Sequence, residues 1–204
     1  MIRTSLIRLT AVGVAVTALA GCALLSSPDP VQTYRFGGAA PAVSQSVSSS
    51  APSIALRRVE FPEAVEGDKL LGVTGTETAY IKGARWVSPA ADLYMESLEN
   101  AFAGQATGVR LIGPRESVRS GRSLDIDVRA FEARYDAPGA VPTVVVTARA
   151  RVRNLPDRTV SAERMFSVEQ PATENRVSAI VAAFDTATRD LNTQIVAWTE
   201  ANAR

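Results

Sequence analysis

Three successive segments in the second half of the chain alternate apolar with polar or charged side chains, over residues 124–135, 144–152 and 159–168. Successive side chains of a β-strand point to opposite faces, so a period of two predicts strands with one apolar face. In the first segment the apolar positions are even up to Val128 and odd from Phe131, and this change of parity indicates a β-bulge. Turn-forming residues separate the segments. We therefore expect an antiparallel meander whose apolar face is covered and whose charged face meets water.

The charged face of the middle strand carries Arg149, Arg151 and Arg153. These arginines could bind lipid phosphate or an acidic partner. Alternatively, they pair across the strands with Asp125 and Asp127 on a solvated face. We favour the second interpretation, because it needs only the neighbouring strand.

Shorter apolar runs earlier in the chain predict further strands and a helix. Strands are expected over residues 31–36, 54–61 and 109–112, with a hairpin of 70–73 and 76–81 around Gly75 and a helical turn at 62–65. Ser88 and Pro89 are typical of a helix start, with Ser88 as N-cap and Pro89 in the first turn. Apolar residues at helical spacing follow, and Gly104 is the expected C-cap.

A long helical pattern runs from about Thr173 to the end of the chain. Val177, Phe184, Leu191 and Trp198 recur every seven residues. The repeat fits a coiled-coil seam or an amphipathic helix packed along a sheet. We favour the packed helix, because the charge pairs that flank a coiled-coil seam are missing. The predicted fold is α/β: one compact domain with a mixed, mostly antiparallel sheet, helices packed on it, and a long C-terminal helix.

The N-terminus is typical of a bacterial lipoprotein precursor. Arg3 and Arg8 precede an apolar run over residues 9–20, which has signal-peptide length and is too short to span a bilayer as a helix. The run ends in Leu19-Ala20-Gly21-Cys22, which matches the bacterial lipobox. The match implies cleavage before Cys22, a diacylglyceryl thioether on its sulfur, and an acyl chain such as palmitate on the new N-terminus.

The chain accordingly divides into three parts. Residues 1–21 are the predicted lipoprotein signal peptide, residues 22–30 a tether, and residues 31–204 the folded domain. Within the domain, residues 37–53 are rich in Gly, Ala, Pro and Ser, so we expect them to form a flexible loop.

The composition excludes most catalytic and metal chemistry. The chain has no histidine, and its single cysteine is the expected lipidation site. A Ser-His-Asp triad, a Cys-His dyad, a His-ligated zinc and an intrachain disulfide therefore cannot form. Carboxylate chemistry remains, but no Asp or Glu stands in a catalytic motif. The 22 basic and 21 acidic residues leave the chain near neutral, which disfavours nucleic acid as a partner, and no phosphate-binding loop occurs. We expect no cofactor, no metal ion and no catalytic residue.

A series of short motifs resembles the ABC-type transport auxiliary lipoprotein family, which includes the paraquat-inducible lipoprotein C type. After the lipobox, the matching segments are Tyr34-Arg35-Phe36, Val59-Glu60-Phe61-Pro62, Asp68-Lys69, Tyr80, Arg85-Trp86-Val87-Ser88-Pro89 and the tail 177–198. The chain departs from the family at Ala64-Val65-Glu66-Gly67, where the family usually has Leu-Asp-Arg after the proline.

The resemblance implies a lipid-anchored periplasmic accessory subunit of an MCE-type ABC transport system. Its partners would be the membrane, through the lipid, and the MCE-domain and permease components, with a homo-oligomer also compatible. The cargo would be phospholipid or another hydrophobic molecule, and transport would support envelope integrity. Ala23 and Leu24 follow Cys22, and the aspartate that retains lipoproteins in the inner membrane is absent. We therefore expect the outer membrane rather than the inner.

Tyr80, Arg85 and Trp86 are the candidate partner or cargo contacts, because Arg and Trp are enriched at interface hot spots. The alternative for Trp86, which we favour, is that it anchors the following helix in the core. A second class of function also stays open: a small ligand-binding lipoprotein or a carboxylate-dependent periplasmic hydrolase. Neighbouring genes for a permease, an ATPase and an MCE protein would favour the transport function.

Overall fold

The computed structural model describes residues 31–38, 47 and 51–203. The signal peptide, Cys22, the tether 22–30 and most of the expected loop 37–53 lie outside the described residues. The folded unit begins at Gln32. Its elements are β1 (Gln32–Tyr34), β2 (Ser53–Glu60), α2 (Glu63–Glu66), β3 (Lys69–Thr74), β4 (Glu77–Trp86), α3 (Ala90–Gln105), β5 (Arg110–Ile112), β6 (Arg122–Tyr135), β7 (Thr143–Asn154), β8 (Val160–Pro171) and α4 (Val177–Asn202).

The strands of the described part of the chain form one mixed, 8-stranded sheet. The long strand β6 pairs with β7 along one edge, and with β2 and then β3 along the other. The β6–β7, β7–β8 and β3–β4 pairs are antiparallel, and β1–β4, β2–β5, β2–β6 and β3–β6 are parallel. The register of β6 shifts between Val128 and Ala130, where the change of parity predicted a bulge. The antiparallel meander is confirmed.

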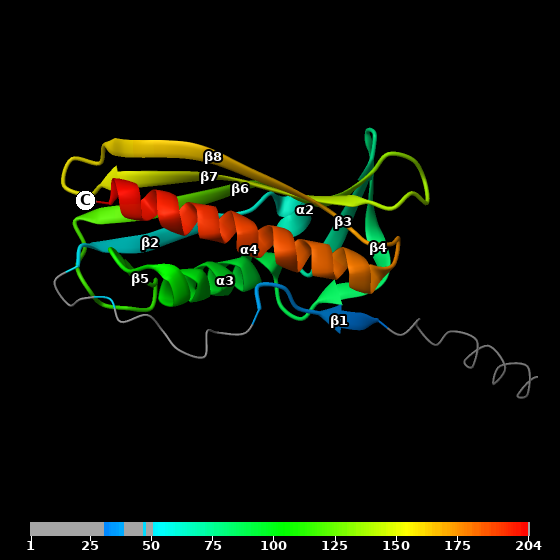
Figure 1. Ribbon diagram of the computed structural model, residues 1–204, viewed down its shortest axis with the longest axis horizontal. Coiled ribbons are helices and arrows are strands. Elements are labelled where there is room, and N and C mark those ends of the chain that lie inside the picture. The colour runs from blue at the N-terminus through cyan, green and yellow to red at the C-terminus, as the bar shows by residue number, and fades with distance from the viewer. Residues whose placement is uncertain (1–30, 39–46, 48–50, 204) are drawn as a thin grey trace, which may run out of the picture. The chain divides into compact units, whose positions relative to one another are not determined.

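Helices α3 and α4 lie on one face of the sheet (Figure 1), with α4 packed along β7 and β8 and beside α3. The inward side chains of β7 are fully buried, and the alanines among them, Ala148 and Ala150, leave room for the helix backbone. Phe184 and Leu191 of α4 are also fully buried, so the seven-residue repeat faces the protein's own core. The α/β fold with a long amphipathic C-terminal helix is therefore confirmed. Among the described residues, none of the helices combines the length and apolar character needed to cross a bilayer.

Several predicted element ends are wrong. Helix α3 has Pro89 rather than Ser88 as its N-cap and forms no side-chain cap bond; the Ala90 N–H instead donates to the Gly67 carbonyl at 2.8 Å. Gly104 lies inside α3, because the helix continues to Gln105. Helix α4 begins at Val177 instead of Thr173, since Arg176 has extended backbone angles.

Candidate functional site

The motif segments, far apart in the sequence, meet in an aromatic cluster in the core. The ring of Phe131 on β6 lies 5.0 Å from Phe36, 5.6 Å from Phe61 and 4.7 Å from Phe184, measured between centroids. Trp86 packs edge-on against Phe36 at 4.9 Å and Phe184 at 5.4 Å. Four of the motif segments thus contribute to one core, together with Phe131 of β6.

Trp86 is only 2% exposed, so its side chain cannot contact a partner on the surface of the folded unit. This placement agrees with the interpretation of Trp86 as a core anchor and corrects its assignment to a contact surface. The physical reason is that Trp86 ends β4 rather than starting an exposed loop, and its backbone N–H donates to the Asp68 carbonyl at 2.7 Å. The next N–H, of Val87, donates to the Tyr34 carbonyl at 2.7 Å.

Tyr80 and Arg85 belong instead to a surface group, which we call the hairpin cluster and define as Asp68, Lys69, Tyr80 and Arg85. The Lys69 ammonium lies 4.6 Å from the centre of the Tyr80 ring, a cation–π distance. Arg85 Nη1 donates to both carboxylate oxygens of Asp68 at 2.8 Å. Tyr80 is 46% exposed, and its hydroxyl donates to the Ala64 carbonyl at 3.2 Å.

A local irregularity of β4 brings these side chains together. Lys69 pairs with Arg85 and Leu71 pairs with Tyr80, so three extra residues of β4 lie between the two pairs. Gly83 lies in this segment with φ +74, a backbone conformation that favours glycine. Lys69 is thus paired with Arg85 in the register while its ammonium lies over the ring of Tyr80. The sequence names Tyr80 and Arg85 as candidates, and the structure adds Asp68 and Lys69 as their partners.

An apolar groove of about 350 Å³ runs beside the hairpin, and we call it the hairpin groove. Its walls include Gly72, Ile81 and Tyr135. A Cβ atom at Gly72 would lie 3.2 Å from Tyr135 Cε2, so the absence of a side chain at Gly72 makes room for the Tyr135 ring. Burial also raises the pKa of the Tyr135 hydroxyl, so the groove is lined by a neutral ring at physiological pH.

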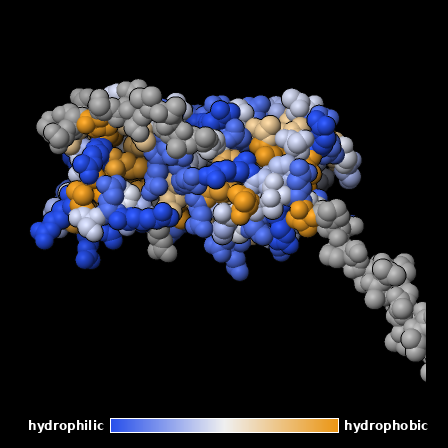
Figure 2. Space-filling view, turned by 90° about the horizontal axis from the view of Figure 1, so that it is seen from below, coloured by the Kyte–Doolittle hydropathy of each residue, from blue (hydrophilic) through white to orange (hydrophobic). Residues whose placement is uncertain are grey.

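Two carboxylates that the sequence did not single out face a second pocket, of about 340 Å³, between α3 and β5. Glu99 and Glu116 line it with Arg110 and Arg115. Burial raises the pKa of the Glu99 carboxyl, Arg115 opposes this shift, and Glu116 adds to it. Seen from the side of β1, α3 and β5, Figure 2 shows small apolar patches among polar side chains. Two carboxylates in the pocket between α3 and β5 are the minimum that a carboxylate-dependent hydrolase would need.

Glu116 is already held in place by its own loop. Its carboxylate accepts the Gly113 N–H at 2.9 Å and lies 3.5 Å from Arg110. These contacts engage the Glu116 carboxylate within its own loop, so its oxygens are less available to take a proton from a substrate. Glu99 is then the remaining candidate for proton transfer.

Replacing Glu99 with Gln is expected to leave envelope function intact. Since folding raises the Glu99 pKa, the folded state binds this proton more tightly, and that contribution to stability is lost as the pH rises through the raised pKa. Glu99→Gln should therefore reduce the loss of stability between pH 4 and pH 8, by under about 1 kcal/mol in the free energy of unfolding, because solvent screens a partly exposed group. Thermal unfolding measures this, with exposed Glu174→Gln as control. A well-folded Glu99→Gln protein that fails to complement a deletion would support the hydrolase instead.

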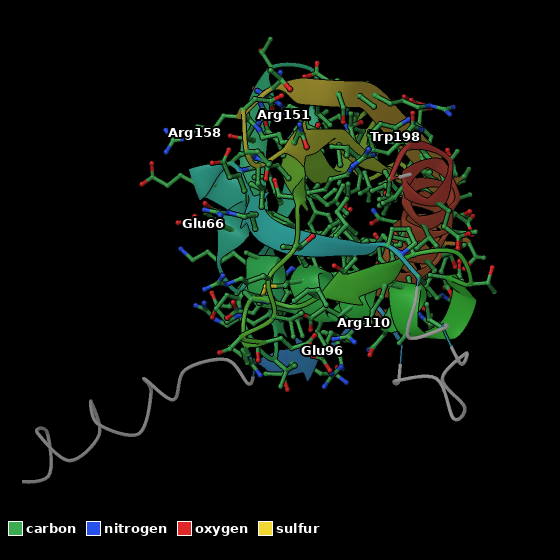
Figure 3. The ribbon with its side chains drawn as sticks, turned by 90° about the vertical axis from the view of Figure 1, so that its left-hand side faces the viewer. Glu66, Glu96, Arg110, Arg151, Arg158 and Trp198 are labelled. Atoms are coloured by element: carbon green, nitrogen blue, oxygen red, sulfur yellow. The ribbon has the colours of Figure 1, made fainter. Side chains whose placement is uncertain are left out.

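The arginine stripe forms ion pairs within the sheet. Arg149 Nη2 donates to Asp127 at 2.8 Å, and Arg153 Nε lies 2.6 Å from Asp125. Arg151 lies directly across from Asp125 in the register, and Figure 3 shows Arg151 on the side of the sheet away from α4. The cross-strand interpretation is therefore confirmed for Arg149 and Arg153.

Comparison with solved structures supports the fold. Protein XCC0632 from Xanthomonas campestris has 25% identity and a TM-score of 0.68, over 84% of this chain and 96% of that one. An uncharacterized protein has 16% identity and a TM-score of 0.63, over 82% and 99%. The hypothetical protein CT253 from Chlamydia trachomatis has 9% identity and a TM-score of 0.52, over 76% and 98%. The last two show similarity of fold alone.

Comparison of the sequence identifies the family. No curated protein matches the chain. The sequence model described as the ABC-type transport auxiliary lipoprotein component matches residues 34–196, which include the aromatic cluster, the hairpin cluster and most of α4. The chain therefore belongs to the ABC-type transport auxiliary lipoprotein component family.

Proposed function

We propose that the protein is a lipid-anchored, non-catalytic subunit that docks the MCE-domain and permease components of an ABC transport system in the periplasm. Its cargo would be phospholipid or another hydrophobic molecule, and Cys22 would tether it to the outer membrane. The family supports the auxiliary role in ABC-type transport. The hairpin cluster is the observation that carries the docking function.

The side chains of the cluster are exposed to solvent and are also held in place by neighbouring groups. A docking site requires both properties. Tyr80 is half-exposed, yet Lys69 lies over its ring and the Ala64 carbonyl holds its hydroxyl. One nitrogen of Arg85, Nη1, donates to both carboxylate oxygens of Asp68, and the Asp68 backbone carbonyl accepts the N–H of buried Trp86. Side chains that are ordered before binding lose little entropy on association. Tyrosine and arginine are also frequent among the residues that dominate binding energy.

Tethering would favour such docking without a strong intrinsic affinity. A lipid anchor confines the domain to one membrane surface and raises its effective concentration near membrane-bound partners. The Asp68–Arg85 and Lys69–Tyr80 pairs would then supply specificity rather than most of the affinity.

Tyr80→Ala is expected to weaken association with the MCE and permease components. A hot-spot tyrosine contributes about 2 kcal/mol, or roughly thirtyfold in Kd. The free energy of unfolding should change by about 1 kcal/mol or less, because the half-exposed side chain loses only its contact with Lys69 and its hydrogen bond to Ala64. Co-purification from membranes and thermal unfolding measure the two effects, with Val118→Ala, which is equally exposed at 46%, as the control.

Three outcomes of this experiment decide between the proposals. Loss of association with Tyr80→Ala alone supports the hairpin cluster as the docking site. Retained association would move docking to another surface. If the parent protein itself retains no transport component, the proposed function is wrong.

A second candidate function, a small ligand-binding lipoprotein, is favoured by the hairpin groove. Its volume of about 350 Å³ falls in the range of small-molecule pockets, and Ile81 and Tyr135 offer an apolar lining. Native mass spectrometry of the purified protein would reveal a retained apolar molecule, and Gly72→Val, which fills the groove, should displace it.

A further inference from the structure

Strand β8 forms an open edge of the sheet. In the described residues it pairs with β7 alone, and Figure 1 shows it at the upper rim of the sheet. Its register with β7 is regular from Ala162 to Pro171. The backbone N–H and C=O groups of alternate β8 residues therefore point outward, ready to pair with another strand.

The middle of β8 is protected by charged side chains alone. Edge strands are usually blunted by lysine, proline, a bulge or short length. β8 is 12 residues long, contains no lysine, has its single proline, Pro171, at its last position, and shifts register only at its start, between Val160 and Ala162. Such an edge favours an extended partner.

The side chains along this edge are of the types that dominate interfaces. On the side of α4, the Arg164 guanidinium lies 4.9 Å above the ring of Phe166, and Phe166 packs edge-on against Trp198 at 5.8 Å. Figure 3 shows Trp198 on α4. On the opposite side of the strand, Met165 is 53% exposed. Trp, Arg and Met are enriched at protein interfaces.

The charge pattern of β8 fits a second copy of itself in one antiparallel register. With Met165 opposite Met165 of the second copy, Arg164 lies opposite Phe166, which is buried and uncharged, so Arg164 meets no like charge. Glu163 then lies opposite Ser167, so the two charges on this part of the strand meet neutral side chains.

The neighbouring registers are unfavourable. A slip of one residue would move every side chain to the opposite face of the sheet. The two strands can therefore slide past each other only in steps of two residues. Centring the pair on Arg164 places the two copies of Arg164 opposite each other. Centring it on Phe166 places Glu163 opposite Glu169. Like charges directly opposite are destabilising, so the charges select the register centred on Met165.

The helices also suit this arrangement. α4 packs along β7 and β8, and joining two β8 edges continues the sheet with strands about 4.8 Å apart. The two copies of α4 would lie over adjacent strand pairs, about 10 Å apart, which is a normal distance for packed helices. The second copy would thus cover both the β8 edge and the side of α4 that carries Trp198.

We infer that two copies of the chain pair through their β8 edges, antiparallel and centred on Met165, to form a continuous sheet. This interface lies on β8 and shares no residue with the hairpin cluster, so either proposal can fail without overturning the other.

Disulfide trapping of the full-length protein in cells tests the register. Residues directly opposite in an antiparallel pair have Cα atoms about 4.5–5.5 Å apart, within the range of a disulfide. Met165→Cys should form a covalent homodimer under oxidising conditions. Glu163→Cys alone should not, because its two copies would lie more than about 13 Å apart. Co-expression of Glu163→Cys with a tagged Ser167→Cys should give the mixed dimer. The parent, with its single Cys22, and Val141→Cys, at 50% exposure, are the controls.

Each pattern of cross-linking supports or overturns the inference. A dimer from Met165→Cys and from the Glu163/Ser167 combination supports it. No dimer from Met165→Cys, equal dimer from Val141→Cys, a dimer from Glu163→Cys alone, or a disulfide to a different protein each overturns it.

A charge substitution tests the same pairing without oxidation. Met165→Glu places two carboxylates opposite each other and should abolish the dimer in detergent, while Val141→Glu should leave it unchanged. Both positions are exposed, so both variants should keep the folded circular dichroism spectrum of the parent. A Met165→Glu protein that stays dimeric overturns the inference.

Discussion

Replacing Trp86 with alanine is expected to lower the free energy of unfolding by about 3–5 kcal/mol, because it opens a cavity in the middle of the core. Trp86 is 2% exposed and contacts Phe36, Phe131 and Phe184, which come from three different parts of the chain. The lost contacts would loosen the packing of the segment after β1, of β6 and of α4 together. Urea unfolding followed by circular dichroism measures the change.

Trp86→Phe is the matched variant for this experiment. The indole Nε1 of Trp86 has no hydrogen-bond partner among the described residues, so removing it breaks no bond. Trp86→Phe should therefore cost less than half as much as Trp86→Ala. An unchanged stability of Trp86→Ala would contradict the core role, and an equal loss in both variants would mean that the indole itself is required.

Local periodicity explains which parts of the fold the sequence could predict. The alternation in β6 and β7 predicts both their inward faces and the bulge at Val128, because neighbouring side chains alone set that pattern. The apolar stripe of α4 likewise predicts a packed helix. The parallel pairing of β2 and β3 with β6 joins segments distant in sequence, and no local pattern encodes it.

The candidate site was predictable only in part, for a reason that lies in β4. The three-residue shift around Gly83 breaks the alternation along this strand, so the sequence cannot tell which of its side chains face outward. Tyr80 therefore lies on the surface and Trp86 in the core, although both were candidates for contact. Glu99 and Glu116 were missed because the connection from α3 to β5 brings them to one pocket, and neither residue stands in a recognisable motif.

Cys22→Ala is expected to remove the protein from its membrane. Cys22 lies outside the described residues, so this prediction rests on the lipobox at residues 19–22. Each buried methylene of a lipid contributes about 0.8 kcal/mol, and a single acyl chain holds a protein only reversibly. The expected diacylglyceryl group and amide-linked chain together give stable anchoring, which the variant would lose entirely. It should accumulate as an uncleaved precursor or as a soluble periplasmic protein, and palmitate labelling should disappear.

A second substitution separates anchoring from sorting. Ala23→Asp keeps the lipidated cysteine and introduces the residue associated with retention in the inner membrane. On a density gradient, the parent should follow outer-membrane markers, Ala23→Asp should follow inner-membrane markers, and both should incorporate palmitate. A Cys22→Ala protein that still fractionates with membranes in processed form would contradict lipidation. Recovery of the parent with inner-membrane markers alone would leave lipidation standing and overturn the outer-membrane assignment. Since docking through a tether depends on which membrane holds it, this result also determines from which side the hairpin cluster would approach a transporter.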